Sequence, residues 1–182
     1  MQNYDYSRLH SSLVGVIQEA QAKIGYDRHA ITLYYPAASL AHMLGTKEDA
    51  DTVEQALSDF SAFAQPTLGA VEVVRDDERF CIYVPAEGAE YVHEKVPDCG
   101  FLKAFLAVVS GLEVSLDDIL AVFHRFSDGV VCEKIEGSDE FDYLVYFKNG
   151  EPDGYRYCIK LDDDGDAVYH RFTPEDYAAF GF

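Results

Sequence analysis

Apolar residues recur every three or four positions along the first stretch of the chain. Between Asp5 and Ile24 they include Leu9, Leu13, Val16, Ile17 and Ala20. This spacing predicts an amphipathic helix that ends at Gly25. A short extended segment, Ile31 to Tyr35, is expected to follow. Pro36 suits the first position of a second helix, which runs to Leu44 and ends at Gly45.

The next helix is expected to begin after Thr46. Asp49 stands three residues later, as in a capping box, so Thr46 is the predicted N-cap. Pro66 is expected to close the region, because proline interrupts the backbone hydrogen bonds of a helix. The buried face of this helix is predicted from four apolar positions: Val53, Ala56, Leu57 and Phe60.

A β-hairpin and three further helices are predicted in the middle of the chain. Val71–Val74 and Phe80–Val84 alternate apolar and polar residues, with a polar turn over Arg75–Arg79. Pro97 separates the first two of the helices, and Ser115 is the expected N-cap of the third. The helices are expected over Glu87–Val96, Phe101–Val109 and Leu116–Phe126.

The last third of the chain has the alternation of a β-sheet. Its strand candidates are separated by turn sequences such as Asn149-Gly150 and Asp164-Gly165. Short connections favour antiparallel neighbours, so we expect a four-stranded meander followed by a closing helix from Thr173 and Pro174. The four candidates are Val130–Ile135, Phe141–Phe147, Tyr155–Leu161 and Ala167–Phe172.

These elements predict an α+β fold. The helix-rich first two-thirds of the chain contains one β-hairpin, and the antiparallel meander comes last, packed against helices in two layers. With 182 residues, 48% of them hydrophobic, the chain is long enough for one well-buried core. We therefore expect a single domain over residues 1–182.

The strongest compositional signal is the charge. The chain has 33 acidic and 14 basic residues, a formal net charge of −19. Nucleic acids and anionic membranes are held by lysine and arginine facing phosphate, so this balance argues against both as partners. The 13 Tyr and 12 Phe favour a folded rather than a disordered chain.

Targeting and cysteine patterns favour a cytoplasmic protein. No stretch approaches the roughly 20 apolar residues of a membrane span, and the first nine residues contain Asp5 and Arg8, unlike a secretory signal. The cysteines form no C-x-x-C pair, so neither a disulfide framework nor a zinc site is expected. They are Cys81, Cys99, Cys132 and Cys158.

Three short runs in the N-terminal part of the chain form a recognisable pattern: Ala22–Tyr26, Ile31–Pro36 and Ser39-Leu40. They resemble a family of small bacterial proteins of unknown function, and the similarity would extend over nearly the whole chain. These residues form a structural signature. The resemblance therefore implies a bacterial domain and assigns neither an activity nor any site residue.

Two short patterns are typical of metal sites. Asp162 to Asp166 resembles a calcium loop, but placing Gly165 sixth would put Lys160 and Arg171 at ligand positions, so a solvated hairpin turn is preferred. Glu90 and His93 have the Glu-x-x-His spacing of di-iron bundles, but the second motif is missing. No metal or cofactor is therefore expected.

No nucleophile motif is present, neither G-x-S-x-G nor a phosphate-binding glycine loop. Cys99 is the best candidate for a Cys–His pair assembled in space, although a structural thiol is the preferred interpretation. His42 and His124 lie among apolar helical positions, which favours hydrogen-bonded structural histidines.

Two functions remain open. The first is a non-catalytic binding module with an acidic surface for a basic protein, since residues 128–166 contain 12 acidic and 4 basic residues. Lys148, Arg156, Lys160 and Arg171 are interspersed in and just after this segment and weaken any phosphate mimicry. The second is a small-molecule binder or hydrolase with a site between helices and sheet. Its candidate residues are His29, Tyr34, Tyr35 and His42.

Overall fold

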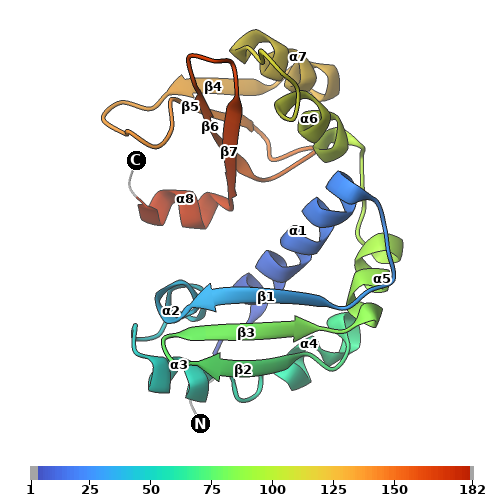
Figure 1. The fold of residues 1–182 in the computed structure, drawn as a ribbon, viewed down its shortest axis with the longest axis vertical. Helices are drawn as coiled ribbons and strands as arrows, with labels where there is room; N and C mark the ends of the chain where they lie inside the picture. The colour runs from blue at the N-terminus through green and yellow to red at the C-terminus, as the bar shows by residue number, and fades with distance from the viewer. Residues whose placement is uncertain (1–3, 181–182) are drawn as a thin grey trace. The chain divides into compact units, whose positions relative to one another are not determined.

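The computed structural model describes residues 4–180, which contain eight helices and two antiparallel sheets (Figure 1). This confirms the α+β class. The chain divides into two compact units, one ending at Pro97 and the other beginning at Asp98. The expectation of one domain stays a prediction, since compactness alone does not establish independent folding.

The N-terminal unit consists of a three-stranded sheet and five helices. The strands pair in the order β1-β3-β2, all antiparallel, so the predicted hairpin is present and β1 extends it. The hairpin is not part of the C-terminal sheet. The elements are α1 (Ser7–Ile24), β1 (Ile31–Pro36), α2 (Ala37–Leu44), α3 (Ala50–Leu57), α4 (Phe60–Leu68), β2 (Glu72–Asp76), β3 (Arg79–Val84) and α5 (Ala86–Lys95).

One face of this sheet packs against the helices. Phe80, Ile82 and Val84 of β3 are fully buried in a core that also contains the apolar side chains of α1 to α5. The predicted apolar face of α1 is confirmed in its central turns. Val16 and Ile24 depart from it, with 39% and 85% of their surfaces exposed.

Two predictions in the N-terminal unit were wrong. Asp49, rather than Thr46, caps α3, since its carboxylate accepts hydrogen bonds from the Thr52 backbone N–H at 2.9 Å and hydroxyl at 2.6 Å. The Thr46 N–H instead donates to the carbonyl of Ala41 at the end of α2. Pro66 does not end the helical region but lies inside α4. Two residues of α4 follow it, so the backbone hydrogen bond that proline cannot form is lost only in the last turn of the helix.

The C-terminal unit contains the predicted meander, with strand order β4-β5-β6-β7. Ser115 caps α7 in a capping box with Asp118, which confirms the predicted N-cap. Strands β4 and β5 are slightly shorter than predicted. The elements are α6 (Phe101–Val109), α7 (Leu116–Phe126), β4 (Val130–Lys134), β5 (Tyr143–Phe147), β6 (Arg156–Leu161), β7 (Ala167–Phe172) and α8 (Pro174–Phe180).

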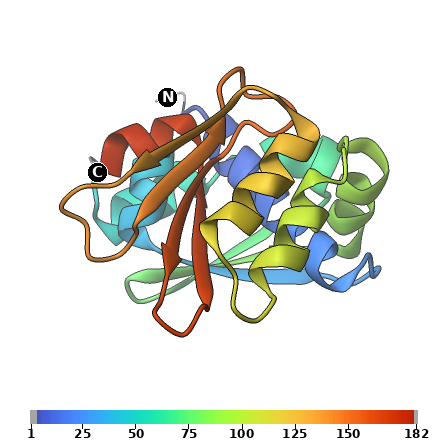
Figure 2. The same ribbon diagram turned by 90° about the horizontal axis from the view of Figure 1, so that it is seen from above.

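An aromatic cluster joins α6 and α7 to the first face of the four-stranded sheet. The two helices lie side by side (Figure 2). The Phe101 ring lies 4.8 Å from those of Phe123 and Phe147, and the Phe105 ring lies 4.7 Å from that of Tyr157. Their edge-to-face geometry is the favoured one for buried rings. Phe147 of β5 and Tyr157 of β6 therefore lie on the face beneath these helices.

The second face of this sheet is partly covered by α8. Leu144, Cys158 and Phe172 are buried there, and Tyr177 of α8 packs against them. Alternation of apolar and polar residues along a strand indicates one buried face, whereas this sheet has buried residues on both faces. The second has its own small core because α8 folds back onto it.

A close approach at Gly88 gives a test of the packing of α5. A Cβ atom at this position would lie 2.5 Å from Val84 Cγ1 and 2.9 Å from the carbonyl oxygen of Leu68. Overpacking costs about 1–3 kcal/mol, more than the ~1 kcal/mol that alanine gains in helix propensity. We expect Gly88→Ala to lower the midpoint of urea unfolding followed by circular dichroism.

Gly129→Ala is the matched control, because its Cβ would meet only ordinary contacts, the nearest at 3.6 Å. Equal midpoints for the two variants would contradict the close packing of α5 on β3 and α4.

Candidate functional site

Two connections of the meander lie at the same end of the four-stranded sheet. The register pairs Lys134 with Tyr143, Tyr143 with Ile159, and Leu161 with Ala167. The loop of residues 135–142 between β4 and β5 and the turn of residues 162–166 between β6 and β7 are therefore neighbours. The β5–β6 connection is at the opposite end.

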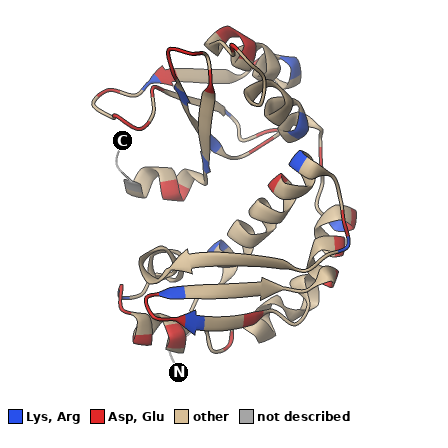
Figure 3. Ribbon diagram, viewed as in Figure 1, with Lys and Arg blue, Asp and Glu red and all other residues tan. Residues whose placement is uncertain are grey.

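Acidic residues gather at this shared end. The loop and the turn contribute eight of them, and Glu113 lies against the turn. All are exposed except Asp142, which is half-buried. We term the nine residues the acidic end (Figure 3): Glu113, Glu136, Asp139, Glu140, Asp142, Asp162, Asp163, Asp164 and Asp166.

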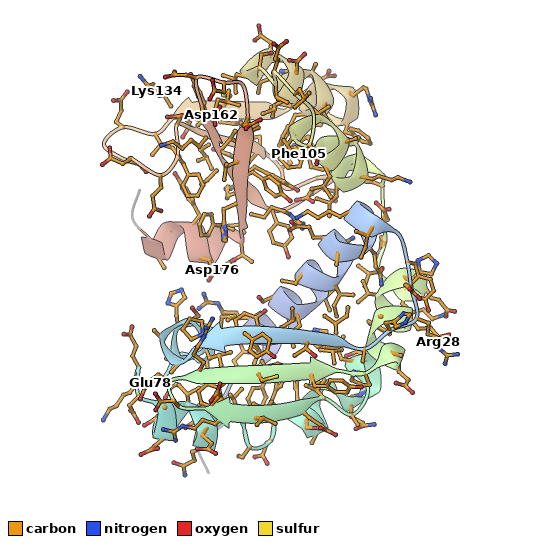
Figure 4. All side chains as sticks on the ribbon, in the orientation of Figure 1. Arg28, Glu78, Phe105, Lys134, Asp162 and Asp176 are labelled. Carbon is orange, nitrogen blue, oxygen red and sulfur yellow. The ribbon has the colours of Figure 1, made fainter. Side chains whose placement is uncertain are left out.

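The Asp162–Asp166 turn is held by its own hydrogen bonds. Oδ1 of Asp162 accepts from the backbone N–H groups of Asp164 at 3.1 Å and Asp166 at 2.9 Å. Gly165 takes a φ of +82°, which favours glycine. The carboxylate of Asp162, which Figure 4 labels, thus shapes the turn, while Asp163 and Asp164 are exposed.

The segment between α6 and α7 is fastened to this turn. The Val114 N–H donates to the Gly165 carbonyl at 2.8 Å. A Cβ atom on Gly165 would lie 2.6 Å from the Cα of Glu113. Only glycine fits so close to another backbone, so Glu113 is held beside the turn.

The 135–142 loop is fixed to β6. Asp142 Oδ2 accepts from the Leu161 N–H at 3.0 Å, and Lys160 donates to the Asp139 carbonyl. The Ser138 hydroxyl accepts from two backbone N–H groups, those of Glu140 and Phe141. The loop is therefore tied down while Glu136 and Glu140 face solvent.

Little positive charge offsets the acidic end. Within residues 4–180, none of its nine carboxylates forms an ion pair. Its strands contribute two cations, Lys134 and Lys160, and Lys160 is engaged with the Asp139 carbonyl. Figure 4 labels Lys134 and Asp162 at this end. Nine like charges against two cations leave a strongly negative surface.

The other cations of the sheet lie at the opposite end. Lys148 follows β5, while Arg156 pairs with Phe172 and Arg171 pairs with Tyr157 in the β6–β7 register. The Arg156 guanidinium stacks over the Tyr146 ring at 3.7 Å. Asp128, Glu151 and Asp153 lie at this end as well, so its three cations are balanced by three acidic residues.

Arg171 belongs to a buried polar cluster. Its side chain is 4% exposed and its Nη2 lies 3.6 Å from Oδ2 of Asp153, while the guanidinium stacks over Tyr155 at 4.0 Å. The Tyr157 hydroxyl donates to Asp153 Oδ2 at 3.0 Å. Burial is the first cause that raises the pKa of Tyr157. The cluster ties the segment before β6 to β7.

The metal candidates take structural positions. Asp162–Asp166 forms a hairpin turn, and Glu90 forms an ion pair with Arg28 at 3.2 Å. His93 stacks flat on Tyr26, with ring centroids 4.1 Å apart. In the described part of the chain, no three His, Cys, Asp or Glu side chains are grouped closely enough to hold a metal ion.

The four residues of the alternative site do not converge. Tyr34 and Tyr35 are adjacent on β1 and point to opposite faces, with Tyr34 63% exposed. Burial raises the pKa of Tyr35. His29 is exposed and pairs with Asp27 at 2.7 Å, while His42 contacts Arg8 at 3.2 Å.

The other candidates have different surroundings. His124 is exposed rather than buried among apolar residues, and Cys99 is exposed. Burial raises the pKa of the Cys158 thiol to about 11. Burial and then Glu133 raise that of Cys132.

The sequence indicated an acidic segment over residues 128–166, but the meeting of two of its connections at one end of the sheet was not predicted. A meander places its first and third connections at one end, so the predicted strands already implied that residues 135–142 and 162–166 meet. Glu113 had no comparable signal, because its position depends on the Gly165 contact.

Comparison with known proteins finds one family. A family model described as "Domain of unknown function, E. rectale Gene description (DUF3877)" matches residues 6–181. No curated protein and no solved structure matches the chain.

The contact between Gly165 and Glu113 can be tested by a pair of glycine substitutions. Gly165→Ala combines an unfavourable φ with a backbone clash, whereas Gly137→Ala has a φ of +79° with nothing within 4 Å. We expect both to lose about 1 kcal/mol of unfolding free energy from the left-handed conformation, and Gly165→Ala to lose about 1–3 kcal/mol more. Urea denaturation measures both; equal losses would show that the turn does not press against Glu113.

Thiol reactivity tests the burial of Cys158. At about pH 8, close to the pKa of an ordinary thiol, iodoacetamide should modify exposed Cys99 readily. Cys158, with its pKa raised to about 11, should react only after unfolding. Peptide mass mapping distinguishes the two sites, and rapid modification of Cys158 in the folded protein would contradict its burial under α8.

Proposed function

The chain belongs to this bacterial family of unknown function, and we propose that it is a non-catalytic binding module whose acidic end docks a basic protein. The single observation that carries the proposal is the excess of negative charge at one end of the four-stranded sheet. Eight acidic residues gather at the end formed by residues 135–142 and 162–166 against two lysines, whereas acidic and basic residues balance at the other end.

The local structure favours docking over a purely solvating role. A surface that binds a partner benefits from charges held in place beforehand, because less conformational entropy is lost on association. The turn is fixed by Asp162, and the loop by Asp142 and Ser138. The remaining carboxylates are therefore presented on ordered backbone.

The partner class follows from the charge. Unpaired exposed carboxylates attract lysine and arginine, speed association and make binding sensitive to salt. In the sequence, the basic residues interspersed among the acidic ones argue against an anionic binding surface. Lys148, Arg156 and Arg171 now support one, since the register places them at the opposite end of the sheet. We therefore propose a basic protein surface as the partner.

We also propose a cytoplasmic location. All four cysteines are free thiols, which is usual in a reducing compartment. Within residues 4–180, no helix has the length and apolarity needed to cross a membrane.

Binding of a decalysine peptide to the full chain tests the role of the acidic end. The variant Glu136→Gln, Glu140→Gln, Asp163→Asn, Asp164→Asn removes four charges and spares Asp142 and Asp162, which hold the backbone. We expect calorimetry at low salt to show about tenfold weaker binding, as several exposed charges together would give. High salt should remove most of the binding to the unaltered chain.

A control variant removes the same number of charges elsewhere. Glu48, Glu87, Glu94 and Glu151 are exposed and lie outside the acidic end. Their change to glutamine should alter the affinity by less than about twofold. Equal losses in the two variants would mean that decalysine senses only net charge, and the proposed docking surface would be rejected.

A further inference from the structure

Within the described residues of the N-terminal unit, no helix covers the outer face of its sheet (Figure 1). Its helices lie against the other face, where Phe80 and Ile82 are buried (Figures 1 and 2). The outward side chains form three rows in the β1-β3-β2 register. They are Thr32–Tyr83–Glu72, Tyr34–Cys81–Val74 and Pro36–Arg79–Asp76.

The middle of this face is apolar. Tyr34 is 63% exposed and Val74 is 58% exposed, and they flank Cys81 in one row. Tyr83, 39% exposed, is next along β3. Contiguous exposed apolar side chains that include tyrosine are typical of protein interaction surfaces. We term these four residues the apolar strip.

Acidic side chains border the strip on one side. Glu72 and Asp76 are exposed on β2, and Asp77 and Glu78 are exposed in the hairpin turn, where Figure 4 labels Glu78. Within residues 4–180, none of the four carboxylates forms an ion pair. Arg79 is the one cation among the outward residues of the three rows. The border therefore complements positive charge.

The size of the face favours a short segment over a second copy of the chain. Three strands about 4.8 Å apart, each contributing about five residues of 3.3 Å, cover roughly 14 by 17 Å. A stable dimer buries about 800 Å² on each partner, well beyond that area. A second copy related by twofold symmetry would also add a second acidic border.

We propose that this face docks a short peptide segment of another protein, with apolar or aromatic residues on the apolar strip and lysine or arginine toward β2 and its hairpin turn. This surface is separate from the acidic end and goes beyond the function proposed above. The peptide must supply apolar residues for the apolar strip as well as basic residues for the acidic border.

The test uses a phage-displayed library of 12-residue peptides selected against the full chain. We expect enriched peptides to combine aromatic or aliphatic residues with lysine or arginine. The best peptide, measured by fluorescence anisotropy, should bind at least tenfold more weakly to Tyr34→Ser, Val74→Ser. It should bind severalfold more weakly to Glu72→Gln, Asp76→Asn, with a reduced salt dependence.

Two controls locate the binding. Ile24→Ser, Phe63→Ser removes two exposed apolar side chains of the same unit, at positions on α1 and α4. The four-charge variant of the acidic end removes charge from the other surface. The affinity should stay within about twofold of the unaltered chain in both controls.

The opposing outcomes are distinct. Peptides without basic residues, equal losses in the controls, or no enrichment would overturn the proposal. Concentration-dependent dimerisation abolished by Tyr34→Ser, Val74→Ser in sedimentation experiments would do so as well, in favour of a second copy. Loss of affinity in the acidic-end variant alone would overturn this inference and leave the proposed function intact.

Discussion

Antiparallel hydrogen bonding between β4, β5, β6 and β7 places both acidic connections at the same end of the C-terminal sheet. A one-residue slip would turn every side chain of a strand to the other face, and a parallel pairing would separate the two connections. The aromatic cluster around Phe101 and the core beneath α8 fix this register, because each requires its own face of the strands to point inward. The distribution of charge therefore rests on apolar packing.

The two sheets differ in how their faces are covered by helices. The four-stranded sheet is covered by α6 and α7 on one face and partly by α8 on the other, whereas the helices described in the N-terminal unit cover one face of the three-stranded sheet. Tyr34 and Val74 are exposed on its open face. Within one chain, the C-terminal sheet thus carries a strongly acidic surface and the N-terminal sheet an apolar strip with an acidic border, which suits contacts of different chemistry.

Much of the fold could be predicted because it follows from patterns within short stretches of sequence. The meander, the hairpin and the Ser115 cap follow from alternation and turn chemistry over a few residues. Thr46 and Asp49 both satisfy the sequence rule for an N-cap, and the structure uses Asp49. Pro66 was expected to end the helical region but lies inside α4. The pairing of β1 with β3 and the contact of Glu113 with Gly165 join distant parts of the sequence. Local patterns do not encode either contact. Of the acidic end, the two connections could be predicted from the strands, but the position of Glu113 could not.

The most direct measurement is a map of backbone amide chemical shifts by nuclear magnetic resonance during titration with decalysine at low salt. If the acidic end is the docking surface, the largest changes fall in residues 135–142 and 162–166 and near Glu113, and salt reverses them. Changes spread evenly over the exposed carboxylates of both units, or centred elsewhere, would contradict a dedicated acidic docking surface.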